Sequence, residues 1–163
     1  MKRTLTVLVL ALGTIGLSAC AFQPLYGDAR QVSTVRNIDV AVEGQDRIDQ
    51  LLSEALNDRF GTPSGNGYRL VAVTDLARSG LGVGADDIAS RAALVLTVDF
   101  SLVDTRTGTP VLTDAVRTEA SFDIPAEPYA AITARRDAEE RVTQEAADRM
   151  ALRIARFVHR DSR

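Results

Sequence analysis

The sequence predicts an α+β domain in which two helices pack on one face of a four-stranded mixed sheet, in the order β-α-β-β-β-α. Four segments alternate apolar and polar residues with a period of two, which is typical of half-buried strands. Two other segments repeat apolar residues at the spacing of amphipathic helices. Short stretches rich in Gly, Pro and polar residues separate these segments, as expected for loops.

The first strand and the first helix follow each other closely. Apolar residues largely alternate over Val35–Val42, which predicts a strand that ends at Gly44. Asp46 stands where the N-cap of a helix belongs, and Gly61 with Pro63 ends that helix. The apolar stripe of the helix consists of Ile48, Leu51, Leu52, Ala55, Leu56 and Phe60.

A loop over residues 62–67 leads to the second strand. Tyr68–Thr74 alternates, and the second face of this strand is also fairly apolar. The following residues, 76–90, contain Gly80, Gly82, Gly84 and the pair Asp86 and Asp87. This composition predicts either a long flexible connection or an irregular extension of the strand.

The third and fourth strands are expected to form an antiparallel hairpin. Arg91–Val103 is strongly β-like, and Val111–Ile124 alternates again. Residues 104–110 between them read DTRTGTP, a composition typical of a turn. Pro125 and Pro128 then close the hairpin.

The last helix is predicted over residues 134–159, a segment without Gly or Pro. Its apolar stripe consists of Ala138, Val142, Ala146, Met150, Ile154 and Phe157. Its charged residues include Glu139, Glu140, Arg141, Glu145 and Arg149. We expect these charges to form a solvated face with i,i+4 pairs, such as Glu145 with Arg149.

The order of the elements predicts the topology. The first two strands flank a helix, so they should lie parallel, joined by a right-handed crossover. Both helices should cover the same face of the sheet, because no third helix is present in the pattern to cover the other. The second face then meets water or a partner, and candidate residues for it are Val71, Val73, Val95 and Phe100.

The N-terminus predicts a lipoprotein signal peptide over residues 1–19. Lys2 and Arg3 precede an apolar run of about 13 residues that ends at Leu17, too short for the roughly 20 residues of a membrane-spanning helix. Leu17, Ser18 and Ala19 then precede Cys20, the only cysteine of the chain, as in a signal-peptidase recognition sequence. This order resembles the lipobox of bacterial lipoproteins, and the resemblance implies cleavage after Ala19 and lipid attachment at Cys20. Two or more acyl chains would then hold the protein stably on a bilayer.

The predicted mature chain divides into a lipidated tether, residues 20–34, and a single domain, residues 35–163. Its stability must come from packing, because no cysteine remains for a disulfide. Loss of Lys2 and Arg3 changes the net charge from −3 to −5 and leaves arginine as the only strongly basic residue. Net acidity argues against nucleic-acid binding, but it leaves room for a local arginine site for an anionic lipid.

The residue types present do not suggest an enzyme. His159 is the only histidine, and its place at the end of a helix favours a role as a helix-terminal cation. The paired acids Asp86 and Asp87 suit a solvated turn, and no spacing of Cys and His predicts a metal site. We therefore expect no catalytic residues, no metal and no cofactor, although residue types alone leave a carboxylate-only hydrolase open.

The predicted mature start CAFQPLYG, the segment FSLVDTRTG and the helix entry DAEER resemble the LptE family of lipopolysaccharide-assembly lipoproteins in its alphaproteobacterial form. The predicted mature start, CAFQPLYG, is similar to the family's Cys-Gly-Phe-x-Pro-Leu-Tyr-Gly opening, with Ala21 in place of Gly. The later matches are Arg91 to Thr97, Phe100 to Gly108 (FSLVDTRTG), Tyr129 with Ala130, and Asp137 to Arg141 (DAEER). Together with the order of elements, these matches cover nearly all of the mature chain.

The resemblance implies a role without catalysis. LptE proteins sit inside the outer-membrane β-barrel LptD, help it fold and support delivery of lipopolysaccharide to the outer leaflet. The family's fold, two helices on a four-stranded sheet, agrees with the predicted elements. The resemblance also implies an outer-membrane location with the domain facing the periplasm and the barrel lumen, and Ala21 after the cysteine is compatible with it.

Lipopolysaccharide carries phosphates or uronic acids, which arginine side chains on exposed loops can bind. Candidate contacts lie in or beside the later strands and turns, and each could equally be an ordinary solvated side chain; they are Arg78, Arg91, Arg106 and Arg117. Two other functions stay open. One is an auxiliary lipoprotein of an ABC-type lipid transporter, and the other is a lipid-anchored carboxylate hydrolase.

Overall fold

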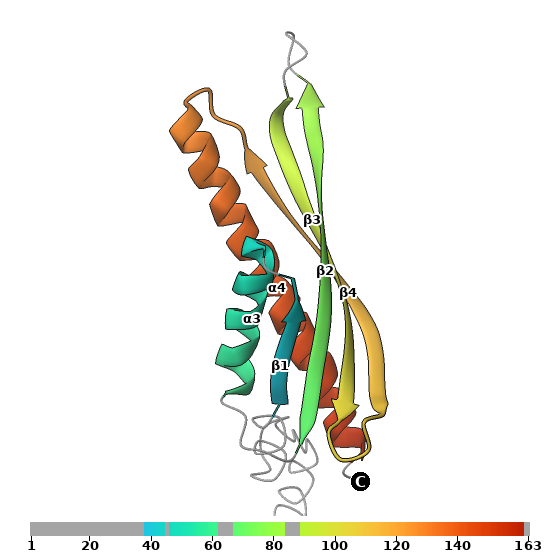
Figure 1. Ribbon diagram of the computed structural model, residues 1–163. Helices are drawn as coiled ribbons and strands as arrows, with labels where there is room; N and C mark the ends of the chain where they lie inside the picture. Colours follow the sequence, from blue (N-terminus) through green and yellow to red (C-terminus); the bar gives the residue numbers. More distant parts are fainter. Residues whose placement is uncertain (1–37, 45, 62–66, 84–88, 162–163) are drawn as a thin grey trace, which may run out of the picture.

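The computed structural model describes residues 38–44, 46–61, 67–83 and 89–161, and their elements follow the predicted order (Figure 1). These elements are β1 (Ile38–Glu43), α3 (Arg47–Phe60), β2 (Tyr68–Val83), β3 (Ala89–Asp104), β4 (Pro110–Asp123) and α4 (Pro128–Asp161). The predicted signal peptide, Cys20 and the tether lie outside the described residues, as do Asp86 and Asp87.

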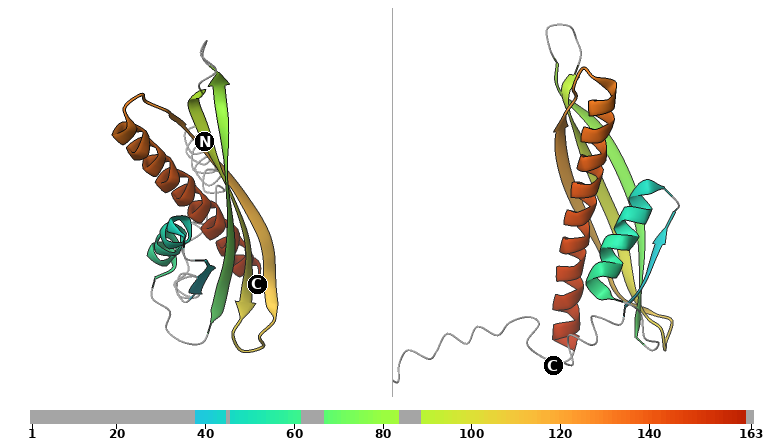
Figure 2. Two further views of the ribbon diagram at one scale, coloured as in Figure 1. Left: turned by 45° about the horizontal axis from the view of Figure 1, so that its top comes forward. Right: turned by 90° about the vertical axis from the view of Figure 1, so that its left-hand side faces the viewer.

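The four strands form one mixed sheet in the order β1-β2-β3-β4. β1 runs parallel to β2, as the flanking helix predicts, and the pairs β2–β3 and β3–β4 are antiparallel. Both helices lie on the same side of the sheet, and the opposite side carries no helix of the described chain (Figure 2). The predicted fold class is therefore confirmed.

The core lies between this sheet and the two helices. α4 packs along β4 and β3, while α3 packs against α4 and β1. Alternate residues of β3 supply the centre of the core, and all are buried: Leu94, Leu96, Val98, Phe100 and Leu102. The stripes predicted from the helical periodicity face them, since Leu52, Leu56, Met150 and Ile154 are all fully buried.

The Gly-containing segment after Thr74 is an extension of β2. Pairing with β3 continues from Leu76 opposite Leu96 to Gly80 opposite Ala92, so the segment is a regular strand rather than a connection. Ladder hydrogen bonds to a long neighbouring strand outweigh the low strand preference of glycine here. β2 is thus 16 residues long, whereas β1 pairs with only its first six.

One residue predicted for the uncovered face is on the other side. Phe100 stands opposite Ala72, and both are buried beneath the helices, whereas Val71, Val73 and Val95 do lie on the uncovered face. The prediction was wrong for Phe100 because the strand register decides the face, and a one-residue change moves a side chain to the opposite side.

α4 begins six residues earlier than predicted, at Pro128 rather than Ala134. Proline suits the first turn of a helix, where its missing N–H leaves no hydrogen bond unmade. The Ala131 N–H donates to the Glu127 carbonyl at 3.0 Å, which closes the first turn. The helix has 34 residues and is therefore about 51 Å long. None of the helices in the described ranges has the length and hydrophobicity needed to cross a membrane.

Candidate functional site

The uncovered face of the sheet, called the outer face below, is a surface that could meet a partner. It carries the odd-numbered residues of the three long strands, and in its central part all are exposed or half-buried: Val71, Val73, Asp75 and Ala77; Val95, Thr97, Asp99 and Ser101; Thr113, Ala115, Arg117 and Glu119. Small apolar, hydroxyl and charged side chains of both signs alternate on it. The outer face is therefore broad and mostly polar.

The four candidate arginines do not form one site. Arg91 and Arg117 lie on the outer face, while Arg78 is on the helix-covered side and stands over the Phe122 ring, 5.8 Å from its centre. Arg106 lies in the turn between β3 and β4, at the end of the molecule where α4 finishes (Figure 1).

The four arginines also differ in their partners. Arg91 Nε lies 3.0 Å from Asp123 Oδ1 across the strands, an exposed ion pair of small energy. Arg106 binds Asp104 at 3.0 Å, and this hydrogen bond holds the pKa of the Asp104 carboxyl below its ordinary value. Within the described residues the Arg117 guanidinium has no hydrogen bond or ion pair, so it is the most available of the four.

A network of charges fixes the start of α3 to α4. Glu139 is buried and accepts from Arg47 Nε at 3.2 Å and from Arg135 Nε at 2.9 Å. The prediction that Glu139 belongs to the solvated face was wrong, because α3 packs over it and brings Arg47 to its carboxylate. The i,i+4 pair of Glu145 with Arg149 is confirmed at 2.5 Å.

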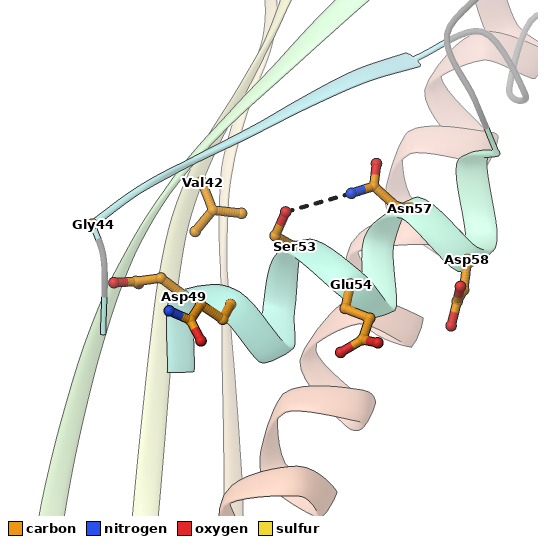
Figure 3. A pocket seen from close by; sticks show the side chains of 8 residues that line it. Val42, Gly44, Asp49, Ser53, Glu54, Asn57 and Asp58 are labelled. Carbon is orange, nitrogen blue, oxygen red and sulfur yellow. Dashed lines mark hydrogen bonds between the residues drawn. The ribbon is translucent and has the colours of Figure 1, made fainter. Parts of the chain in front are cut away.

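A cavity of about 510 Å³ between β1 and α3 tests the hydrolase alternative, because its lining includes three carboxylates (Figure 3). Both oxygens of the Asp49 carboxylate already accept hydrogen bonds, from the Asp46 N–H at 3.0 Å and from the Thr74 hydroxyl at 2.5 Å. Glu54 and Asp58 point away from Asp49. These acids do not converge, and this cavity therefore lacks the carboxylate pair that glycoside hydrolysis requires.

Asp49 has a structural role that also explains Gly44. A side chain at position 44 would place its Cβ 2.0 Å from Asp49 Oδ2, and the φ of +133° disfavours other residues. The glycine thus allows the chain to turn from β1 into α3 while Asp49 holds the first turn of the helix.

A second cavity, of about 530 Å³, lies where the last turns of α4 meet the start of β4. Its lining is rich in basic side chains: Leu112, Asp114, Arg153, Arg156, His159 and Arg160. Arg153 donates to Asp114 Oδ1 at 2.5 Å, and this hydrogen bond lowers the pKa of that carboxyl. Our sequence reasoning did not single out these arginines, although the eleven residues from 153 to 163 contain four arginines and one acid.

The comparisons with known proteins agree with the resemblance found in the motifs. The family model described as LptE, lipopolysaccharide-assembly, matches residues 31–154. The crystal structure of a lipoprotein from Caulobacter crescentus CB15 is 30% identical, with a TM-score of 0.65, over 82% of this chain and 98% of that one. Among curated proteins, none matches this chain.

Two more distant structures share the fold. The rare lipoprotein B from Shewanella oneidensis is 15% identical with a TM-score of 0.56, over 77% of this chain and 98% of its own. A minor lipoprotein from Acinetobacter baumannii is 17% identical with a TM-score of 0.53, over 74% and 93%. The match to the family over most of the described domain, together with the 30% identical Caulobacter protein, shows that this chain belongs to the LptE family of lipopolysaccharide-assembly proteins.

Proposed function

We propose that this protein is an outer-membrane lipoprotein that occupies the lumen of an LptD-type β-barrel, assists the assembly of that barrel and supports insertion of lipopolysaccharide into the outer leaflet. The observation that carries the proposal is the family match over residues 31–154, which spans all four strands, α3 and most of α4. This role requires a surface rather than a catalytic centre, so we propose that the protein is not an enzyme.

The anchor is part of the proposal. Cys20 receives the lipid after cleavage that follows Leu17, Ser18 and Ala19, and the domain then works in the periplasm and the barrel lumen. The signal-like N-terminus supports this step, because a charged start, a short apolar run and a single cysteine occur in the required order.

The outer face is the surface that we propose for the barrel. Its mixed polar and small side chains suit the lumen of a large barrel, which is also polar. We expect the fit between this strand surface and the lumen to bury well over about 2,000 Å² in total, the range of permanent complexes. The ion pairs among Arg47, Arg135 and Glu139 support this role, because they tie α3 to α4 behind the sheet.

We also propose that arginines contact the phosphates of lipopolysaccharide. Arg117 is the first candidate, because its guanidinium has no partner among the described residues and stands on the outer face. Arg91 is the second, since its exposed pair with Asp123 can be exchanged for a phosphate at small cost. Arg78 and Arg106 stay candidates of lower availability, because Phe122 and Asp104 already engage them.

The test is recovery of the partner with the affinity-tagged full chain from detergent-solubilised outer membranes, with co-purifying proteins identified by mass spectrometry. We expect one LptD-type barrel at close to equal amounts. Recovery of an inner-membrane permease with an ATPase would instead support the transporter-auxiliary function. Recovery of no membrane protein would contradict both.

Two matched variants identify the surface. Ala115→Arg places a long cation in the middle of the outer face, whereas Ala126→Arg makes the same change at an exposed position between β4 and α4. We expect Ala115→Arg to reduce recovery of the barrel at least tenfold and Ala126→Arg to leave it unchanged, because a desolvated charge at an interface costs more than about 1.4 kcal/mol. Equal recovery of the barrel with both variants would show that the outer face does not contact it.

A further inference from the structure

Apart from Arg106, the proposed function does not use the residues at the basic end of the molecule. It comprises Arg106 in the β3–β4 turn and Arg153, Arg156 and Arg160 at the end of α4. The β3–β4 turn and the end of α4 lie at the same end of the elongated domain (Figure 1). The chain as a whole is acidic, with a net charge of −3, so this concentration of positive charge is against the average of the molecule.

Helix stability alone does not explain this cluster. Cations in the last turn interact favourably with the helix dipole, which accounts for His159 and Arg160. Arg156 lies further from the terminus, and Arg106 belongs to a different element. Among the described residues, moreover, neither Arg156 nor Arg160 forms an ion pair, so their charge is available to a ligand.

Exposed apolar side chains accompany these cations. Val111, beside the β3–β4 turn, is 37% exposed, and Leu152, one turn before Arg156, is 41% exposed. The cavity at this end is lined by Leu112 and by the basic residues of α4. Cations beside small apolar groups are the combination that favours contact with an anionic bilayer surface.

The same end carries the start of the domain. β1 begins at the same end, at Ile38, on the opposite edge of the sheet from β4 (Figure 1). Seventeen residues lie between Cys20 and Ile38, so the chain between these two residues can span at most about 65 Å. An acyl group on Cys20 would therefore attach the domain to its leaflet through the end at which β1 begins.

We propose that the basic end, Arg106, Arg153, Arg156 and Arg160, docks onto anionic phospholipid headgroups of the leaflet that holds the anchor. The inference depends on the proposed function only through the lipid on Cys20. In the free lipoprotein, docking would hold this end of the domain nearer to the bilayer than the opposite end. Arg156 and Arg160 make the main contacts, because Arg153 is shared with Asp114 and Arg106 with Asp104.

The test uses the acylated full chain in vesicles of phosphatidylcholine, with or without phosphatidylglycerol. Because Cys20 is the only native cysteine and carries the lipid, a cysteine introduced elsewhere is a unique site for a fluorophore. Thr109→Cys labels the basic end, and Ala126→Cys labels the opposite end. Energy transfer to acceptor-labelled headgroups then reports which end is near the bilayer.

We expect phosphatidylglycerol to increase transfer from position 109 and not from position 126. In the double variant Arg156→Gln/Arg160→Gln, the ratio of docked to undocked protein should fall about 30-fold, since each cation near an anionic surface contributes about a fivefold factor. The matched control Arg136→Gln/Arg141→Gln removes two exposed arginines of α4 outside the basic end and should leave this ratio unchanged. The inference would be overturned if energy transfer from position 109 were the same with and without phosphatidylglycerol. It would also be overturned if this transfer fell equally in both double variants.

Mass spectrometry of the purified chain separates this inference from the proposed function. A mass without acyl chains contradicts the anchor, and sedimentation of the same protein with vesicles then decides docking by itself. Loss of vesicle docking with normal recovery of the barrel would contradict only the inference. Loss of barrel recovery with normal docking would contradict only the proposed function.

Discussion

The two edges of the sheet are protected in different ways. Along the β4 edge, α4 runs beside the strand and three of its arginines donate to outward carbonyls. Arg141 reaches the Ser121 carbonyl at 3.1 Å, Arg149 that of Arg117 at 2.6 Å, and Arg153 that of Ala115 at 2.9 Å. These three side chains, called the edge clamps below, occupy backbone groups that could otherwise pair with another strand.

The opposite edge has no such cover over its upper half. β1 pairs with β2 from Tyr68 to Val73, and beyond Val73 no described strand continues the sheet. Charged side chains at Asp75 and Arg78, and Gly80 further on, are the features of this segment that discourage strand addition. The two edges therefore differ in their backbone hydrogen bonding. Side chains of the neighbouring helix occupy backbone groups of β4, whereas the protruding part of β2 has backbone groups that can still pair with another strand.

Two adjacent proline substitutions in β2 test this difference, with the largest expected effect. The Ala115 carbonyl points away from β3, so the backbone groups of its partner Asp99 point toward β2. By the same alternation, the backbone groups of Ala77 point toward β3 and form hydrogen bonds with it. Ala77→Pro should therefore cost about 3 kcal/mol of unfolding free energy, since it removes a ladder bond. Urea unfolding followed by far-ultraviolet circular dichroism measures it.

Arg78→Pro is the matched comparison. The Arg78 N–H points away from β3, toward the open edge, so this proline should cost less than half as much as that at Ala77. An equal loss of stability for both variants would show that a bonded neighbour covers this edge.

Removal of the edge clamps should have the next largest effect. The triple variant Arg141→Gln/Arg149→Gln/Arg153→Gln loses three hydrogen bonds to β4 carbonyls, which should lower the free energy of unfolding by about 2 kcal/mol. It should also self-associate more readily, because the edge is then open, and analytical ultracentrifugation detects this. The control variant Arg136→Gln/Arg156→Gln/Arg160→Gln removes the same charge but no hydrogen bond to a β4 carbonyl. A similar loss of unfolding free energy in this control would contradict a stabilising role of the edge clamps.

The contacts of the edge clamps with β4 could not be predicted from the sequence. Periodicity predicts α4 and its charged face, and the pair of Glu145 with Arg149 follows from their spacing. It does not predict that Arg149 also reaches the Arg117 carbonyl, because that contact depends on where β4 ends up beside the helix. The burial of Glu139 was missed for the same reason, since its partner Arg47 is 92 residues away in the sequence.

Strand limits show the same division between local and long-range information. Gly44 and Gly61 end their elements as predicted, because turn chemistry is local. The extension of β2 to Val83 depends on β3 as a template, and the face of Phe100 depends on register. The arginines of the basic end were visible as a cluster in the sequence, but only the fold brings them beside the β3–β4 turn.

The contact of α4 with β4 beneath the clamps should have a smaller effect. Thr118 is buried and donates its hydroxyl to the Val142 carbonyl at 2.9 Å. Thr118→Val keeps the shape and removes this bond, and should cost about 1 kcal/mol in urea unfolding. Thr113→Val, the same change at an exposed position of β4, should stay within about 0.5 kcal/mol. A larger effect at position 113 would contradict the assignment of the two faces.

The smallest effect concerns the pH dependence of the last clamp. The hydrogen bond from Arg153 lowers the pKa of Asp114 below its ordinary value of 3.8. A carboxyl whose pKa is lowered by folding stabilises the protein above its unfolded pKa, and this contribution is lost as the pH falls through the folded pKa. The gain is that of a partly exposed ion pair, less than about 1 kcal/mol. Asp114→Asn should therefore lower stability slightly at pH 7 and leave it unchanged near pH 2. A variant that is destabilised equally at both values would mean that Asp114 acts through its shape and its hydrogen bond to the Ala115 N–H, rather than through the charge that holds Arg153 on the edge of β4.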